Sequence, residues 1–259
     1  MIIISKRSGS KKRRLSDKEI AERYKKGEST TVIAGEAGIT PDAVRLVLKK
    51  MNVTLRPRGS WKRKYHVNEH YFKTWSNNMA YILGFFAADG MIPSKGQQIS
   101  FAQKDMSILN LIKQELDSNH PIILNETTNV YILNLNSRVL KEDLMHIHGF
   151  TPRKSMSVQM PDIPGRYKSH FIRGYFDGDG CVYKDKLFIN IVCGSKDFVH
   201  SLSEVLDEQT IKNQIKVFNN YFRLYISGPK DVQNFFRWIY EDKELYMERK
   251  YKTFLNLFT

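Results

Sequence analysis

Two aspartates end two similar apolar segments of the chain and are its clearest candidates for chemistry. Asp89 closes "AYILGFFAADG", which runs from Ala80 to Gly90, and Asp179 closes "SHFIRGYFDGDG", which runs from Ser169 to Gly180. A single Asp-Gly pair is typical of an ordinary helix end, since Gly can supply a left-handed cap. Two carboxylates brought together at helix ends repel each other and the helix dipole, and a divalent cation reverses both effects. Oxygen ligands with positions left for water and phosphate favour Mg²⁺.

Each segment also carries small residues at helical spacing. They are Ala80, Gly84 and Ala88 in the first segment and Gly174 and Gly178 in the second. Glycine inside a helix costs about 1 kcal/mol relative to alanine. Its repeated use indicates that the two helices pack against each other at short range. Such packing would bring the two aspartates together.

The elements that follow each segment repeat in the same order. In both copies a short apolar strand runs into Lys-Asp, at 104–105 and 196–197, and is followed by an amphipathic helix, an alternating strand and another helix. Each copy closes with Arg-Lys, at 153–154 and 249–250, and the offsets run from 90 to 96 residues. This order predicts a duplicated α+β unit, helix–two strands–helix–two strands–helix, with its halves related by a pseudo-twofold axis.

Alternating strands predict which side chains point away from the core. In the second half we expect hairpins that turn at Asp185 and at Asn219–Asn220. Donors and acceptors on the outward positions suit base edges and phosphates, although any one of them could be an ordinary solvent-facing residue. The candidates are Asn134, Asn136, Asn190, Arg223 and Tyr225.

The charge of the chain is concentrated at its start. The net charge is +14, and residues 1–66 hold 18 Lys/Arg against 6 Asp/Glu, whereas residues 67–259 hold 23 against 21. This distribution favours nucleic acid over a membrane surface as partner, because no lipid-seeking amphipathic helix accompanies it. No apolar run approaches the length of a membrane span. The two cysteines have no ligand spacing for zinc, and they suit a reducing compartment. We expect a cytoplasmic, nucleoid-associated protein that is encoded by a bacterium or a phage.

The N-terminal part resembles a helix-turn-helix unit. Ser16 and Glu19 predict a capping box, a short helix follows at 31–36, and Thr40 with Pro41 begins a third helix. On that third helix Arg45 and Lys49 lie opposite the apolar face, where a recognition helix would meet the major groove. A small three-helix bundle with a solvated charged face is the alternative. The basic residues that follow could track phosphates, and they are Arg56, Arg58, Lys62, Arg63 and Lys64.

These patterns predict five regions. They are a basic flexible arm over 1–12, a helix-turn-helix module over 13–58, a basic linker over 59–73, and two repeated halves over 74–165 and 166–259.

The paired segments "ILGFFAADG" and "IRGYFDGDG" resemble the signature helices of the LAGLIDADG homing endonucleases in their monomeric form. The resemblance covers about residues 66–259. It implies a saddle of two αββαββα halves whose sheets lie in the major groove of a long, imperfectly palindromic double-stranded DNA site. It also implies two or three divalent ions, Mg²⁺, shared with the DNA phosphates and cleavage of both strands.

The resemblance assigns site residues one by one. The metal ligands would be Asp89 and Asp179, with the residues before them, Ala88 and Gly178. The polar residue near the attacking water resembles Gln103 in the first half and Ser195 in the second, and this mismatch could make the two strand cuts unequal in rate. Late basic residues near the site resemble Lys154 and Lys250. Asp177 matches a first acid that is usually structural, and Ala87 stands there in the first half.

Three functions remain open on sequence alone. The first is a Mg²⁺-dependent, site-specific double-strand endonuclease that acts as a monomer with no obligate protein partner. The second is a transcription regulator that has kept the scaffold without the chemistry, and both motif acids being present counts against it. The third is an RNA maturase, since the family includes such proteins. The target sequence, and whether the gene is intron-borne, intein-borne or free-standing, stay open.

Overall fold

The chain forms two compact units. The computed structural model describes residues 13–56, 64–152, 156–183 and 186–258, and the units divide between Lys64 and Tyr65. Residues 65–73, which composition assigns to a linker, are attached to the C-terminal unit. The amide of His66 donates to Asn119 Oδ1 at 2.7 Å, and Phe72 is fully buried. The basic arm over 1–12 lies outside the described residues.

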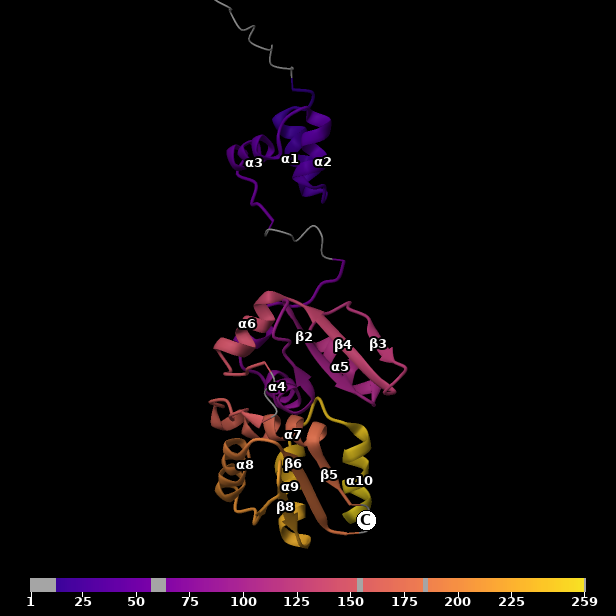
Figure 1. Ribbon diagram of the computed structural model, residues 1–259, viewed down its shortest axis with the longest axis vertical. Helices are drawn as coiled ribbons and strands as arrows, with labels where there is room; N and C mark the ends of the chain where they lie inside the picture. The colour runs from indigo at the N-terminus through magenta and orange to yellow at the C-terminus, as the bar shows by residue number, and fades with distance from the viewer. Residues whose placement is uncertain (1–12, 57–63, 153–155, 184–185, 259) are drawn as a thin grey trace, which may run out of the picture. The chain divides into compact units, whose positions relative to one another are not determined.

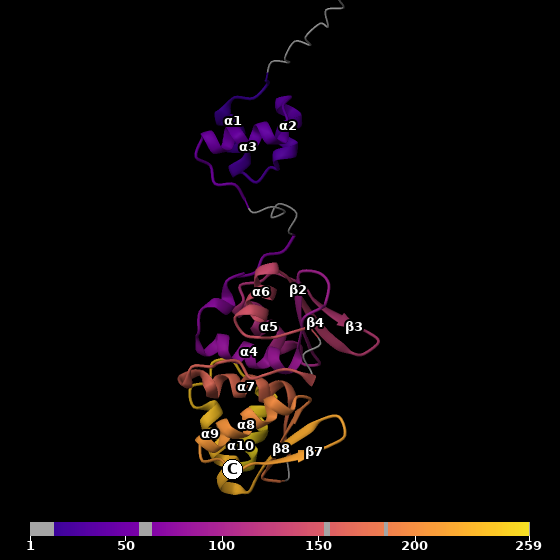
Figure 2. The same cartoon turned by 60° about the vertical axis from the view of Figure 1, so that its left-hand side comes forward.

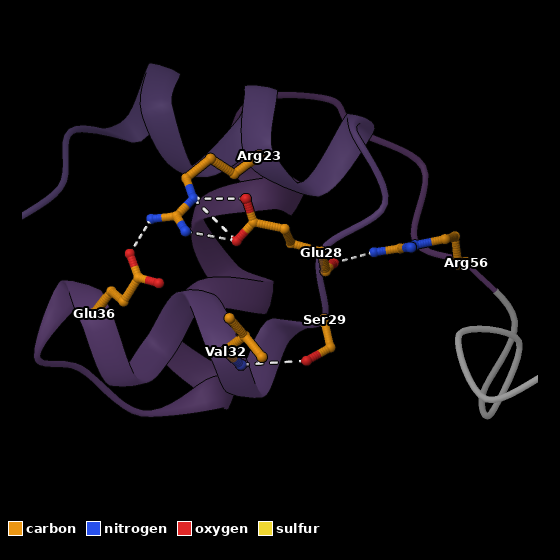
Figure 3. Close-up of polar contacts among 6 residues, drawn as sticks. All are labelled: Arg23, Glu28, Ser29, Val32, Glu36 and Arg56. Carbon is orange, nitrogen blue, oxygen red and sulfur yellow. Dashed lines mark hydrogen bonds and ion pairs between the residues drawn. The ribbon is translucent and has the colours of Figure 1, made fainter.

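The N-terminal unit contains three helices, α1 (Asp17–Lys25), α2 (Thr30–Ala37) and α3 (Pro41–Lys50). The capping box of Ser16 and Glu19 and the Thr40 cap with Pro41 at the first helical position are both confirmed. Gly38 ends α2 with a φ of 70°, the left-handed conformation that glycine adopts without strain. The three helices bury a small apolar core made of Ile20, Ala21, Tyr24, Ile33, Ala34, Ala37, Val44 and Leu48. Figure 3 shows the polar contacts around it, in which Arg23 pairs with both Glu28 and Glu36.

The C-terminal unit contains two halves with one order of elements. The first half consists of α4 (Asn77–Asp89), β1 (Gly90–Met91), β2 (Gln98–Gln103), α5 (Met106–Glu115), β3 (Ile122–Asn125), β4 (Val130–Asn136) and α6 (Arg138–His146). The second half consists of α7 (Lys168–Asp179), β5 (Gly180–Val182), β6 (Phe188–Cys193), α8 (Lys196–Glu208), β7 (Gln214–Val217), β8 (Phe222–Ser227), α9 (Pro229–Tyr240) and α10 (Glu248–Phe258). The antiparallel sheets have the matching orders β1-β2-β4-β3 and β5-β6-β8-β7. The duplicated α+β architecture is therefore as predicted.

The strands show the expected alternation. Leu133 and Leu135 on β4 and Leu224 and Ile226 on β8 are fully buried beneath the helices, because they lie on one side of their pleated strands. The predicted turn at Asn219–Asn220 joins β7 to β8, and the amide of Phe218 donates to the carbonyl of Tyr221 across it at 2.9 Å. The turn expected at Asp185 lies outside the described residues.

Helices α4 and α7 pack against each other at the middle of the C-terminal unit, and both views show the two halves on opposite sides of this pair (Figures 1 and 2). A Cβ added to Gly84 would lie 1.9 Å from the carbonyl oxygen of Phe171, and one added to Gly174 would lie 1.9 Å from that of Tyr81. Only a hydrogen fits at these two points. The close, glycine-lined contact between α4 and α7 that the sequence predicts is thus present. We call it the seam, and its contacts are symmetric between the halves.

Helix α10 has no counterpart among the described residues of the first half. Its Phe254 is fully buried and packs between the rings of Phe176 and Phe235, with centroid distances of 5.6 and 6.5 Å. None of the helices in the described ranges is long and apolar enough to cross a membrane.

Candidate functional site

The two signature aspartates lie at neighbouring ends of the seam. Asp89 is the last residue of α4 and Asp179 the last of α7. A Cβ built on Gly178 would lie 3.1 Å from Asp89 Oδ2 and 2.3 Å from the Cβ of Ala88. A side chain at position 178 would therefore push the ends of the two helices apart, which explains the small residues before both aspartates.

The glycines that follow the aspartates are not left-handed caps. Gly90 and Gly180 have φ values of −83° and −87° and extended ψ values, so each helix passes directly into a strand. A Cβ would lie 2.2 Å from the Phe86 ring at Gly90 and 2.1 Å from the Phe176 ring at Gly180. The glycines let each aspartate stand at the junction of a helix with the first strand of its sheet.

Gln103 contacts the first aspartate directly. It is the last residue of β2, and its Nε2 donates to Asp89 Oδ2 at 2.7 Å. Its Oε1 accepts from the backbone amide of Lys104 at 2.8 Å, which fixes the orientation of the amide group. The structure thus brings together two residues that the resemblance assigned to one site.

The strand register corrects the equivalence of Gln103 with Ser195. Gly90 pairs with Phe101 and Gly180 with Ile191, so the position of Gln103, two residues after Phe101, corresponds to Cys193. Ser195 is instead the N-cap of α8, where its Oγ accepts from the amide of Phe198 at 3.3 Å. Asp105 has the same capping role at α5.

A tyrosine and a cysteine stand beside the second aspartate. Burial, the nearby carboxylate of Asp179 and the thiol of Cys193 together raise the pKa of the Tyr175 hydroxyl well above its ordinary value. That hydroxyl also donates to the carbonyl of Val192 at 3.3 Å. Phe85 stands at the position of Tyr175 in the first half, so the surroundings of the two aspartates differ chemically.

Lys250 is hydrogen-bonded to the C-terminal end of α7. It is only 5% exposed, and its Nζ donates to the carbonyls of Phe176 and Asp177 at 2.6 and 2.7 Å. Burial lowers its pKa to about 8. A cation on the last carbonyls of a helix stabilises the helix end, and here it also interacts with the charges of Asp177, Asp89 and Asp179. Lys154, its proposed counterpart, lies outside the described residues.

A buried polar network that was not predicted lies on the second-half side of the seam. Asp177 accepts from the hydroxyl of Tyr81 on α4 at 2.8 Å and from the amide of Met247 at 2.7 Å, and burial raises its pKa to about 6. Arg173 is fully buried and donates to the carbonyls of Ile239 and Leu245 and to His170 Nδ1. An arginine and a histidine among the aromatic residues of α7 were the available sequence signal. These groups fix α7 against α9 and the segment before α10.

The outward strand residues differ in accessibility. Asn136 is exposed, while Asn134 accepts from the hydroxyl of Ser100 at 2.6 Å. Arg223 and Tyr225 are half-buried on the outer face of the second sheet. Asn190 is only 6% exposed, so it is covered by its neighbours rather than presented to a ligand.

The basic residues of the N-terminal unit also divide into two kinds. Arg45 and Lys49 are exposed on α3, where Arg45 pairs with Asp42. Arg56 is held within the unit, because its Nη2 donates to the carbonyl of Glu28 (Figure 3). Its Nη1 donates to the carbonyl of Gly27 at 2.7 Å, and its guanidinium lies 4.2 Å from the centroid of the Tyr24 ring. Arg58, Lys62 and Arg63 lie outside the described residues.

Comparison with known proteins finds family models that match two segments of the chain. Residues 166–240 match the family model of the LAGLIDADG-like domain, and residues 5–63 match that of a helix-turn-helix domain. Full-length DUF199/WhiA from Thermatoga maritima is similar in structure, with a TM-score of 0.50 at 19% identity over 74% of this chain and 65% of that one. The LAGLIDADG homing endonuclease I-LtrWI bound to its target DNA gives a TM-score of 0.49 at 15% identity, covering 74% and 90% of the two chains.

Curated relatives match over short parts of their length. A probable translation initiation factor IF-2 from Thermococcus kodakarensis is 29% identical over 162 residues, which make up 60% of this chain and 14% of that protein. The chain spans less than a fifth of each curated relative that it matches, and these include an elongation factor and a replication factor subunit. The similarity is therefore that of a shared segment within proteins of different function.

Proposed function

We propose that this protein is a site-specific DNA endonuclease that cuts both strands and uses the aspartates at the ends of α4 and α7 as metal ligands. DNA binding is supported by the helix-turn-helix and LAGLIDADG-like domains. The proposed cleavage rests on the seam, where Asp89 lies against Gly178 with no room for a side chain between them. Because Gly178 directly precedes Asp179, the two aspartates end neighbouring helices.

The donors present at the seam fit a hard divalent cation such as Mg²⁺. The ranges that the structure describes hold no cluster of three or more His, Cys, Asp or Glu side chains that could enclose a metal. Two carboxylates alone leave most positions of an octahedral ion to water and phosphate oxygens, which is how Mg²⁺ is usually bound at phosphate sites. When bound, such an ion supplies charge stabilisation and an activated water for phosphodiester hydrolysis.

The protein's own groups prepare the two carboxylates. Gln103 holds Asp89 at 2.7 Å and is itself held by the backbone, so the carboxylate of the first half has a fixed orientation. In the second half Tyr175 contacts Asp179, and Lys250 ties down the last carbonyls of α7. Fixed ligands lower the reorganisation needed in the transition state.

The test replaces each carboxylate by its amide. Asp89→Asn and Asp179→Asn should each bind DNA as the parent does but lose double-strand cleavage by more than about 100-fold, because even residues that only orient metal ligands cost 10- to 100-fold when removed. Cleavage of the protein's own flanking genomic DNA, with and without Mg²⁺, is the measurement. Asp197→Asn, an exposed aspartate in the first turn of α8, removes the same charge and should cut normally. Undiminished cutting by Asp89→Asn or Asp179→Asn would remove them from the site.

A DNA-binding regulator without nuclease activity is the second candidate. The observation that favours it is the second half, where Cys193 rather than a glutamine occupies the position equivalent to Gln103. If the parent protein binds its DNA but cuts neither strand at any Mg²⁺ concentration, this candidate replaces the nuclease.

A further inference from the structure

The outer face of the second sheet holds an arginine among aromatic rings. Leu224 and Ile226 are buried beneath β8, which fixes Arg223 and Tyr225 on the opposite side of that strand. The Arg223 guanidinium lies 5.2 Å from the centroid of the Phe218 ring and 5.3 Å from that of Tyr221. These two rings stack on each other at 4.8 Å with planes only 6° apart. A guanidinium held against aromatic rings keeps its charge and loses little conformational freedom on binding.

The Arg223 guanidinium is hydrogen-bonded to the side chain of Tyr225, which raises its pKa, but one of its nitrogens and one oxygen of Asn190 lack partners among the described residues. Within the described residues Arg223 Nε and Asn190 Oδ1 are inaccessible to solvent and make no hydrogen bond. Asn190 pairs with Tyr225 and Val192 with Arg223 across β6 and β8, so Asn190 and Arg223 are diagonal neighbours on one face. One atom is a donor and the other an acceptor. Buried groups of this kind are costly to leave unpaired, and a rearrangement that pairs them is favoured.

The first half does not share this feature. On its outer face Asn134 Oδ1 accepts from the Ser100 hydroxyl at 2.6 Å, so that amide is already fixed. No arginine occurs on β1, β2, β3 or β4. The unpaired donor and acceptor therefore belong to the second sheet.

We propose that Arg223 reads a guanine in the major groove and that Asn190 is a positioning residue for it. The inference rests on the proposed DNA binding and does not require cleavage. The guanine edge presents two acceptors, N7 and O6, and two donors of one guanidinium match them. With Nη1 and Nη2 on guanine, Nε is left to donate to Asn190 Oδ1. Binding would then satisfy both unpaired atoms at once.

Selection from random double-stranded DNA tests this without knowledge of the natural target. The full chain is incubated with the library in EDTA, which separates binding from cleavage, and the bound DNA is sequenced. The parent should enrich a site with an invariant guanine that Arg223→Gln no longer selects. Replacing that guanine by adenine should weaken parent binding by about 5- to 150-fold and leave Arg223→Gln nearly unaffected.

Variants at position 190 separate positioning from a structural role. Asn190→Leu should reduce the guanine preference only when Arg223 is present, and Asn190→Asp, which keeps an acceptor, should retain it. Arg237→Gln removes an equal charge from an exposed site on α9 and should change no base preference. Thermal unfolding of each variant confirms that it folds.

Three results would overturn the proposal. If Arg223→Gln weakens binding equally for all sequences, Arg223 contacts phosphate rather than a base. If the preference that disappears with Arg223 is for another base, the guanine assignment is wrong. If the parent binds no DNA in EDTA or in Ca²⁺, the proposed DNA binding fails together with the readout.

Discussion

At the level of single residues, the two candidate catalytic positions are not copies of each other. Asp89 is held by the amide of Gln103, whereas Asp179 lies with Tyr175 and Cys193. The resemblance equated Ser195 with Gln103, and each of these residues directly precedes the Lys-Asp pair that follows its strand. This equivalence is wrong because Gly194 and Ser195 separate Cys193 from Lys196, whereas Lys104 follows Gln103 directly, a difference that only the strand pairing exposes.

This asymmetry predicts that Gln103 affects the cleavage of one DNA strand and not the other. Gln103→Leu removes the hydrogen bond to Asp89 and should slow the cut made by the first half by about 10- to 100-fold, leaving the other cut near its parent rate. With a separate label on each DNA strand, the variant should produce nicked DNA in which only one of the two strands is cut. The control is Gln97→Leu, at an exposed position just before β2. Equal slowing of both strands would mean that Gln103 acts on the fold rather than on one site.

A second residue-level prediction concerns acid stability. Burial and the charge of Arg173 lower the pKa of His170 to about 4 from an ordinary value near 6.5. The unfolded chain therefore takes up this proton first as pH falls, and the stability that neutral His170 contributes above pH 6.5 is lost toward pH 4. The raised pKa of Asp177, about 6, acts in the opposite direction between roughly pH 6 and 4.

Comparison with His170→Gln isolates the histidine. The difference in unfolding free energy between parent and variant should shrink by on the order of 3 kcal/mol from pH 7 to pH 4. Urea denaturation at each pH measures it. A difference that stays constant with pH would show that His170 is not neutral and buried in solution.

At the level of elements, hydrophobic spacing predicted most of the C-terminal unit. Alternation in β4 and β8 and the small residues of α4 and α7 reflect local geometry, so they can be read directly from the sequence. The buried Arg173 and the packing of α10 depend on carbonyl groups and rings far away in the chain. Leu245, which receives the Arg173 guanidinium, lies 72 residues on. No local pattern encodes such a partner.

The seam gives a prediction about glycine. Gly84→Ala and Gly174→Ala would each place a Cβ within 2 Å of a backbone carbonyl, which cannot move without shifting a helix. Each change should therefore destabilise the C-terminal unit by about 1–3 kcal/mol or more. Thermal unfolding measures the loss. Gly165→Ala, where a Cβ meets nothing within 4 Å, is the matched control and should be nearly neutral. A neutral Gly84→Ala would mean that the helices are further apart than described.

At the level of the whole molecule, charge and candidate chemistry belong to different units. The N-terminal unit carries the basic excess of the sequence, and the C-terminal unit carries the seam and both aspartates. Composition located this division within a few residues. Composition could not show that residues 65–73 join the second unit. These residues contact Asn119 and Leu116, which lie some fifty residues further along the sequence.

Removal of residues 1–64 tests the role of the first unit. Affinity for DNA should fall, and the slope of log affinity against log salt should become shallower by about 0.9 for each DNA phosphate that the removed residues neutralise. Titration of labelled DNA from 50 to 200 mM salt provides the measurement. The truncated chain keeps the core around α4 and α7, so its unfolding temperature should match that of the parent's C-terminal unit. An unchanged slope would remove the N-terminal unit from the DNA interface.

The hydrogen bond from Tyr81 to Asp177 has a consequence for self-association. Under the symmetry of the seam, Tyr81 corresponds to Phe171 and Asp177 to Ala87, so the reciprocal contact is apolar. If two first halves from different chains packed together, each Tyr81 hydroxyl would face Ala87 and would lack a hydrogen-bond acceptor. Two second halves would bury a pair of Asp177 carboxyls, each facing a phenylalanine. The two halves are thus complementary at this contact, and we expect each half to pack less well against a copy of itself than against the other half of the same chain.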